Sequence, residues 1–325
     1  MILLLALSLA QAEVLLSDNE CAAQVVMTMP PLSPHSPVES GGYIIYPSLI
    51  GDDDSIRSTI KKLKENSSIE PFVAVDLEGG HFNAFGPSPK HPSAADQHDV
   101  DGARAAGEAA GARLSALGFN VNFAPSLDMA AEGNMARQYR SYGTDPVDVA
   151  QKAEAFAKGL HQHGVLAVGK HYPGYGALSG NTDVETVTAP WTKEELEHHQ
   201  LPFVLVGEEL DGVLFSSINY PAIGPGPAHS IPALVDEAHE SGWLTFTDDL
   251  VISARVADIP LREAVVAALA AGLDILVISA PPDWGDHDGA QMVLEAMAKD
   301  SAIKSQVRRA CERVLQSKVK LKKEQ

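Results

Sequence analysis

The chain is poor in cysteine, in basic residues and in long hydrophobic stretches, and each shortage argues against a class of protein. Only two cysteines occur among 325 residues, Cys21 and Cys311. Without a C-x-x-C pair, neither a zinc site nor a redox dithiol is expected. We expect free, partly buried thiols, although a disulfide would fit an oxidising compartment.

Lys and Arg number 24 against 43 Asp and Glu, a formal net charge of -19. Such a chain repels nucleic acid and anionic membrane surfaces, so neither is an expected partner.

One apolar run, MILLLALSLAQA, opens the chain. Its core, Ile2–Ala10, is too short to span a bilayer, and the closing Ala-Gln-Ala fits an A-x-A cleavage site. We predict a signal peptide over residues 1–12, a mature chain from Glu13 and a periplasmic or secreted location. No Lys or Arg precedes the run, so a first strand or a misassigned start stays open, and with it a cytoplasmic location. No later segment is predicted to span a membrane.

Short β-branched runs alternate with Ala-rich or amphipathic stretches along the rest of the chain. The runs are continuous and apolar, which is typical of parallel strands buried on both faces. We predict strands at Gln24–Met29, Gly42–Pro47, Phe72–Asp76, Asn120–Pro125, Leu166–Lys170, Gly212–Ser217, Leu244–Asp249 and Asp274–Ser279.

The intervening stretches predict helices, for example over 101–118, 145–164 and Leu261–Gly272. The second of these begins with Asp-Pro, a helix cap followed by proline at the first helical position. About eight strand–helix alternations favour an α/β fold, a TIM-type (β/α)8 barrel forming a single domain over residues 13–325. No G-x-G-x-x-G follows the first strand, which argues against a dinucleotide-binding fold.

Polar residues follow four of the predicted strands. In a TIM barrel the chemistry lies on the loops at the carboxyl ends of the strands. The residues at these ends are Asp76 and Glu78, Asp128, Lys170 and His171, and Asp248 and Asp249. Each one alone could cap the next helix. Charge at four strand ends together predicts a polar site at the mouth of the barrel.

Six motifs follow one another along the chain. They are VDLEGG from Val75, GFNVNFAPSLDMA from Gly118, RSYGTDP from Arg140, KHYPGYG from Lys170, NYPAI from Asn219 and TFTDDL from Thr245. In order and spacing they resemble V-D-x-E-G-G, G-x-x-x-x-F-A-P-x-x-D, R-S-F-G-x-D-P, K-H-F-P-G-H-G, Y-P-A and S-D-D-L of glycoside hydrolase family 3. The resemblance covers nearly the whole mature chain. It is strongest to the bacterial single-domain β-N-acetylglucosaminidases (β-hexosaminidases) of that family.

The resemblance implies a retaining exo-glycosidase acting through a covalent glycosyl-enzyme intermediate. Its substrate would be a terminal β-linked sugar, in the first place N-acetylglucosamine, on oligosaccharides or cell-wall fragments. Asp248 would be the nucleophile, because an ionised carboxylate can form and then release a glycosyl ester. No cofactor or metal is implied, carbohydrate is the expected partner, and we expect a monomer.

The resemblance also assigns the residues that hold the terminal sugar. Asp76, Arg140, Lys170 and His171 would bind its hydroxyls, with Asp128 lining the same pocket. Carboxylates accept hydrogen bonds from hydroxyls and cationic groups donate to them, and charge strengthens both kinds of bond. Lys170 could also be the Schiff-base lysine of a barrel aldolase, but the flanking motifs argue against this.

The loop after KHYPGYG departs from the family pattern. In the acetylglucosaminidase branch it ends in D-[ST]-H, where the histidine is the general acid/base and the aspartate orients it. Here ALSGNTDVE is slightly longer, with Asp183 in the orienting position and Glu185 where the histidine is expected. We predict Glu185 as the acid/base, because a glutamic acid can protonate a leaving oxygen and then activate water. A solvated Glu185 without a catalytic role is the alternative.

Three further positions differ from the family. His81 stands where arginine is usual, and Tyr175 and Ser217 stand where histidines are usual. Several changes around one pocket leave two other readings open, a β-glucosidase-type relative and a catalytically impaired sugar-binding barrel. An anionic acid/base would repel phosphate, so we predict hydrolysis rather than phosphorolysis.

Overall fold

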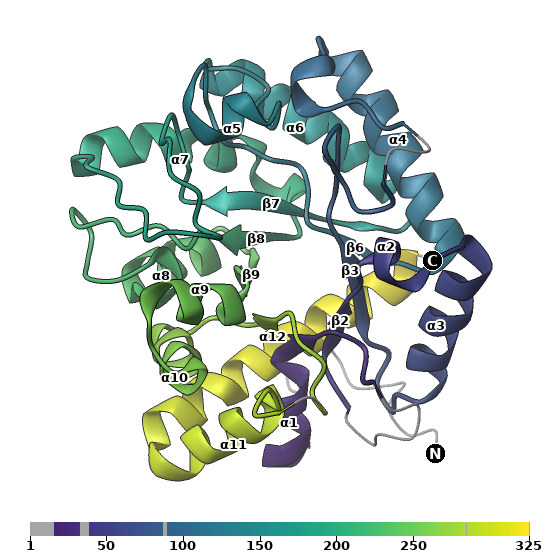
Figure 1. The fold of residues 1–325 in the computed structure, drawn as a ribbon, viewed down its shortest axis with the longest axis vertical. Coiled ribbons are helices and arrows are strands. Elements are labelled where there is room, and N and C mark those ends of the chain that lie inside the picture. Colours follow the sequence, from purple (N-terminus) through teal and green to yellow (C-terminus); the bar gives the residue numbers. More distant parts are fainter. Residues whose placement is uncertain (1–15, 33–38, 87–89, 284, 325) are drawn as a thin grey trace.

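The structure, a computed structural model, describes residues 16–32, 39–86, 90–283 and 285–324. The predicted signal peptide, residues 1–12, lies outside these ranges. A parallel eight-stranded sheet surrounds the centre of the molecule, with helices outside it (Figure 1). The strand order is β10-β1-β2-β3-β6-β7-β8-β9. The TIM-type (β/α)8 barrel predicted from the alternation of strands and helices is confirmed.

Each of the eight predicted strands is present. The barrel strands are β1 (Val26–Thr28), β2 (Gly42–Ile44), β3 (Phe72–Val75), β6 (Val121–Asn122), β7 (Leu166–Tyr172), β8 (Gly212–Phe215), β9 (Leu244–Thr247) and β10 (Leu276–Ile278). The barrel closes between β9 and β10, where the Ile275 N–H donates to Thr245 O and the Thr247 N–H donates to Ile275 O, both at 3.0 Å. Strand β7 runs two residues beyond its predicted end at Lys170, so His171 also belongs to the strand.

The α-helices of the described residues are α1 (Asp18–Gln24), α2 (Pro47–Ile50), α3 (Asp53–Glu65), α4 (Val100–Leu117), α5 (Gly133–Arg137), α6 (Pro146–His161), α7 (Lys193–Val206), α8 (Pro232–Glu240), α9 (Leu250–Ala257), α10 (Leu261–Ala271), α11 (Gly289–Lys299) and α12 (Ser301–Glu324). The three helices predicted over 101–118, 145–164 and Leu261–Gly272 are present as α4, α6 and α10, although α6 ends at His161, before the predicted Gly164. The Asp145 carboxylate caps α6 by accepting from the N–H groups of Val147 and Asp148. No helix in the described ranges combines the length and apolar character needed to cross a membrane.

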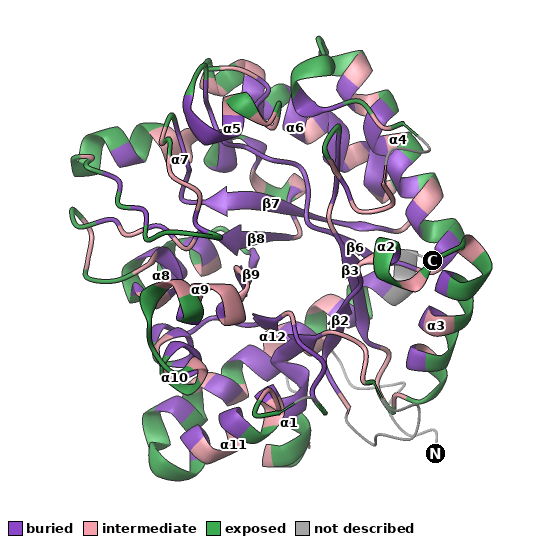
Figure 2. Ribbon diagram, viewed as in Figure 1, coloured by how far each residue is buried: buried purple, intermediate pink, exposed green. Residues whose placement is uncertain are grey.

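The barrel interior is packed with apolar side chains, and one end is plugged by α12. Figure 2 shows the strands buried and the exposed residues on the outer faces of the helices. Val314 and Leu321 of α12 pack in the same cluster as Phe72, Phe123 and Phe246 of the barrel. Since Phe72 is the first residue of β3, α12 covers the amino ends of the strands. The carboxyl ends are therefore left to form the site.

A disulfide joins Cys21 of α1 to Cys311 of α12, with a Cα–Cα distance of 5.3 Å. The expectation of free thiols is wrong. Both residues are fully buried, and the packing of α1 against α12 brings together two cysteines that sequence position alone keeps far apart. The disulfide ties the first described helix to the helix that plugs the barrel.

Loss of this disulfide is expected to destabilise the fold. It links residues 290 positions apart, so it restricts the unfolded chain strongly, and such cross-links contribute about 2–4 kcal/mol. The double variant Cys21→Ser, Cys311→Ser should lose about that much free energy of unfolding, measured by urea denaturation with circular dichroism. Dithiothreitol should weaken the parent equally and leave the double variant unchanged. An unchanged parent would show that the bond does not form.

Candidate active site

A cavity of about 330 Å³ opens at the carboxyl ends of the barrel strands. Its volume lies at the lower end of the range of ligand pockets and suits one sugar ring. The ionisable and histidine side chains on its wall are Asp76, His81, Arg140, Lys170, His171, Asp183, Asp248 and Asp249. Six of the eight predicted site residues therefore meet in one cavity. The other two, Asp128 and Glu185, do not line it.

Asp248 follows β9 and is held by two hydrogen bonds. The Asp249 N–H donates to its Oδ1 at 2.9 Å, and the Ser217 hydroxyl donates to its Oδ2 at 3.2 Å. Burial raises the pKa of Asp248, while His171, the Asp249 N–H and the Lys170 ammonium oppose that rise and Asp183 adds to it. The carboxylate is thus oriented, faces the cavity and lies near a second carboxylate.

Glu78 is the buried anchor of the site, at the turn where β4 (Leu77–Gly79) leads into β5 (Phe82–Asn83). Its two oxygens accept from Arg140 Nε at 2.8 Å and Arg140 Nη2 at 2.7 Å. Its Oε1 also lies 2.6 Å from Lys170 Nζ. Burial alone would raise the pKa of Glu78, but the Arg140 and Lys170 charges lower it to about 2. The carboxylate therefore stays ionised and fixes both cations.

Two neighbours fix where Glu78 and Arg140 lie. The Asn122 amide bonds both the N–H and the carbonyl of Leu77, at 2.9 and 3.0 Å. The Phe82 ring covers the Arg140 guanidinium, 3.8 Å from its centroid. Gly79 has a φ of +105°, a conformation that L side chains rarely adopt, so the E-G-G motif needs glycine at this turn.

Lys170 bridges Glu78 to the cavity wall. Its ammonium lies 2.6 Å from Asp76 Oδ1 as well as 2.6 Å from Glu78 Oε1. Burial alone would lower the pKa of Lys170, yet these two carboxylates raise it. A lysine held charged in this way cannot act as the nucleophilic amine of an aldolase, which must be neutral.

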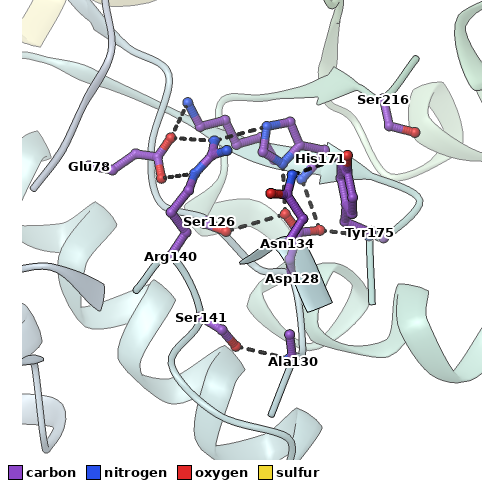
Figure 3. A network of polar contacts seen from close by, with 12 residues as sticks. Glu78, Ser126, Asp128, Ala130, Asn134, Arg140, Ser141, His171, Tyr175 and Ser216 are labelled. Atoms are coloured by element: carbon purple, nitrogen blue, oxygen red, sulfur yellow. Dashed lines mark hydrogen bonds and ion pairs between the residues drawn. The ribbon is translucent and has the colours of Figure 1, made fainter. Parts of the chain in front are cut away.

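His171 is oriented between a cation and a carboxylate (Figure 3). Arg140 Nη2 lies 3.1 Å from His171 Nε2, and Asp128 Oδ2 lies 2.6 Å from Nδ1. Since a guanidinium can only donate, Nε2 is the acceptor and Nδ1 carries the proton that Asp128 accepts. The imidazole is therefore held in a fixed orientation by contacts at both ring nitrogens.

Asp128 does not line the pocket as predicted. It is 1% exposed and lies behind His171, where its Oδ1 accepts from the backbone N–H of Tyr175 at 2.7 Å. Burial would raise the pKa of Asp128, but the bonds from His171 and Tyr175 lower it. Its carboxylate orients other residues because its oxygens are turned toward the protein.

The two acids of the diverged loop have different surroundings. Both residues are exposed, but Asp183 belongs to the cavity wall together with Asp248, whereas Glu185 lies outside that wall. The Glu185 carboxylate turns back on its own loop and accepts from the Asn181 N–H at 3.3 Å. The role predicted for Glu185 stays a prediction, without a position in the cavity to support it.

Sequence reasoning missed the roles of three residues. Glu78 stood at a strand end as a charged residue, but nothing in its motif showed that it would hold Arg140 and Lys170 together. Ser217 and Tyr175 were noted only as departures from the family. The Ser217 hydroxyl donates to the Asp248 carboxylate, and the Tyr175 hydroxyl donates to Gly180 O of the loop. In the described ranges, no three His, Cys, Asp or Glu side chains cluster as metal ligands would.

Comparison of this chain with known proteins identifies the same family that the sequence motifs indicated. Residues 50–317 match the model of the glycosyl hydrolase family 3 N terminal domain. The beta-hexosaminidase of Nitrosomonas eutropha is 31% identical over 246 residues, which cover 71% of this chain and 71% of that protein. The crystal structure of a beta-N-acetylhexosaminidase from Beutenbergia cavernae superposes with a TM-score of 0.82 at 25% identity, covering 93% of this chain and 98% of that one.

A third similar structure is a glycoside hydrolase family 3 beta-N-acetylglucosaminidase from Paenibacillus sp. It has a TM-score of 0.82 at 23% identity, and the match covers 95% of this chain but 62% of that one. This likeness shows the shared barrel. With the family model matched over most of the chain and the motif residues gathered in one cavity, the chain belongs to glycoside hydrolase family 3.

Proposed function

We propose that this chain is a retaining exo-glycosidase that removes a terminal β-linked N-acetylglucosamine from oligosaccharides or cell-wall fragments. The observation that carries the proposal is the position of Asp248, which faces the same cavity as Asp76, Arg140, Lys170 and His171. The names of two similar proteins, a beta-hexosaminidase and a beta-N-acetylhexosaminidase, support the choice of sugar.

The fixed polar groups would bind the terminal ring before any bond breaks. Lys170 and Arg140 can donate to sugar hydroxyls, and the partly exposed Asp76 can accept from them. Because Glu78 and Asp128 hold these groups from behind, binding needs little reordering of the site. The ring would be presented with its anomeric carbon toward Asp248.

The reaction would proceed in two displacements. An Asp248 oxygen attacks the anomeric carbon to form an ester, while the leaving oxygen takes a proton from an acid of the loop 177–185. Water then attacks the same carbon, loses its proton to that loop carboxylate, and releases Asp248. Two inversions at one carbon retain the β configuration.

We also propose that the protein acts outside the cytoplasm, as a monomer. The Cys21–Cys311 disulfide supports an oxidising compartment, in agreement with the signal peptide predicted over residues 1–12. The monomeric state is the expectation already drawn from the sequence.

An aryl β-N-acetylglucosaminide should be cleaved with a higher kcat/KM than the matching aryl β-glucoside, measured by release of the phenol. Asp248→Asn should lower kcat by about 10⁴-fold or more, because the variant has no nucleophilic carboxylate. Asp236→Asn is the matched control, since Asp236 is an exposed aspartate of α8. Preference for the glucoside would favour a β-glucosidase. A chain that cleaves no glycoside would favour a sugar-binding barrel.

The stability of the fold should depend on the ionisation of the partly buried Asp248 carboxyl. Because burial raises the pKa of Asp248, the folded chain holds its proton more tightly than the unfolded chain, whose aspartates titrate near about 3.9. Between these two pKa values stability falls as pH rises. Asp248→Asn cannot ionise, so it should melt above the parent at pH 7, and the gap should vanish below the unfolded pKa. Equal melting temperatures at pH 7, with Asp236→Asn as reference, would contradict this.

Phosphate should not replace water as the acceptor. The cavity wall carries four carboxylates, Asp76, Asp183, Asp248 and Asp249. The cations Lys170 and Arg140 are already paired with carboxylates, so an anionic acceptor would meet net repulsion. Turnover in phosphate buffer should release free N-acetylglucosamine, detected by ion chromatography. A glycosyl 1-phosphate as the main product would refute this expectation.

A further inference from the structure

The diverged loop leaves open which of its residues is the general acid/base. The loop 177–185 carries two acids, Asp183 and Glu185. An acid/base must reach the leaving oxygen, which lies beside the anomeric carbon that the nucleophile attacks. The wall of the cavity includes Asp183, Thr182 and Asn181 from this loop, and it does not include Glu185. Geometry therefore separates the two candidates.

Glu185 already has a bond within the loop. Its carboxylate accepts from the Asn181 N–H at 3.3 Å, and its own N–H donates to Asn181 O at 3.0 Å. Glu185 thus closes the turn that carries Asp183. To reach the cavity it would have to break this turn.

Asp183, in contrast, has a fixed backbone and an unoccupied carboxylate. Its N–H donates to Asn181 Oδ1 at 3.0 Å, and Arg255 Nη2 donates to its carbonyl at 2.9 Å. In the part of the chain that the structure describes, no hydrogen bond or ion pair reaches its carboxylate. A carboxyl in this state is free to exchange its proton with a ligand. Arg255 belongs to α9, which directly follows Asp248, so the two acids are positioned from the same strand–helix unit.

Tyr175, the residue that replaces the family histidine, holds the other side of the loop. Its hydroxyl donates to Gly180 O at 2.8 Å and accepts from the Thr182 N–H at 3.2 Å. Its own N–H bonds Asp128, the carboxylate that orients His171. From α5, the Asn134 N–H donates to Leu178 O at 2.8 Å. The loop is thereby held at the cavity, with Asp183 as part of the cavity wall.

We propose that Asp183 is the general acid/base, and that Glu185 and Tyr175 are positioning residues that hold the loop carrying it. The assignment rests on the proposed glycosidase function. In the first step the C1–O bond to the leaving group breaks as Asp248 bonds C1, and the Asp183 carboxylic acid gives its proton to the departing oxygen. In the second step the Asp183 carboxylate takes a proton from water as the water oxygen bonds C1 and Asp248 leaves. Asp183 ends protonated, as it began.

The test compares leaving groups that need a proton with one that does not. Asp183→Asn should lower kcat/KM for N,N′-diacetylchitobiose by about 10²–10⁴-fold and for the 2,4-dinitrophenyl glycoside by less than about ten-fold. Glu185→Gln, the competing assignment, should change both by similar, small factors. Asp183→Glu keeps the carboxyl and should recover part of the chitobiose activity. Circular dichroism and melting temperature check that each variant folds.

Rescue by azide gives a second test, because azide would not restore activity if Asp183 had only a structural role. In Asp183→Ala the second step lacks a base, but azide attacks C1 without losing a proton. Added azide should therefore raise kcat for the dinitrophenyl glycoside and yield the β-glycosyl azide, identified by mass spectrometry. The parent and Glu185→Gln should yield only the free sugar.

Three results would overturn the assignment, and they are distinguishable. Equal losses for both leaving groups, with no azide product, would make Asp183 a structural residue. A loss that depends on the leaving group in Glu185→Gln but not in Asp183→Asn would make Glu185 the acid/base. In both cases the parent is active and needs Asp248, so the proposed function stands. A parent that cleaves no glycoside would remove the function and the assignment together.

Discussion

The ion pairs of the buried Glu78 carboxylate are the interaction on which the rest of the site depends. Glu78 holds Arg140 through two hydrogen bonds and Lys170 through its Oε1. Its side chain is 4% exposed, so its charge is stable only with both cations in place. Breaking a buried pair by removing one partner costs about 3–5 kcal/mol. The three residues come from a hairpin, a loop and a barrel strand, and the pairing fixes all three.

A chain of hydrogen bonds connects Glu78 and Arg140 to the residues that face the cavity. Arg140 donates to His171, which fixes the tautomer of the ring, and Asp128 holds the opposite nitrogen. Asp128 also bonds the Tyr175 N–H, whose side chain in turn holds the loop with Asp183. The sugar-binding side and the loop side of the cavity are therefore joined through buried hydrogen bonds. Such pre-ordering lowers the entropy lost when a substrate ring is placed.

The fold and most of the site could be predicted from the sequence because both follow from local patterns. Eight apolar runs predicted eight strands, and most of the charged residues at the strand ends line one cavity, whereas Arg140 and Asp183 were assigned through the family motifs. The remainder depended on long-range geometry. Whether Cys21 meets Cys311, and whether Asp128 faces inward, is decided by packing between distant segments. The direction of Glu185 depends on the turn that it closes with Asn181, which residue types alone do not determine.

Three residues that differ from the family pattern, Ser217, Tyr175 and Glu185, each form hydrogen bonds at the site in the structure. Ser217 donates to Asp248, the proposed nucleophile, Tyr175 bonds two backbone groups of the loop, and Glu185 closes the turn that carries Asp183. A barrel that only bound sugar would gain stability by giving up Asp248, because burial disfavours its charge. A partly buried carboxylate held by two hydrogen bonds at the cavity is costly for folding and suits the proposed displacement chemistry. The altered loop therefore fits a changed acid/base better than a lost one.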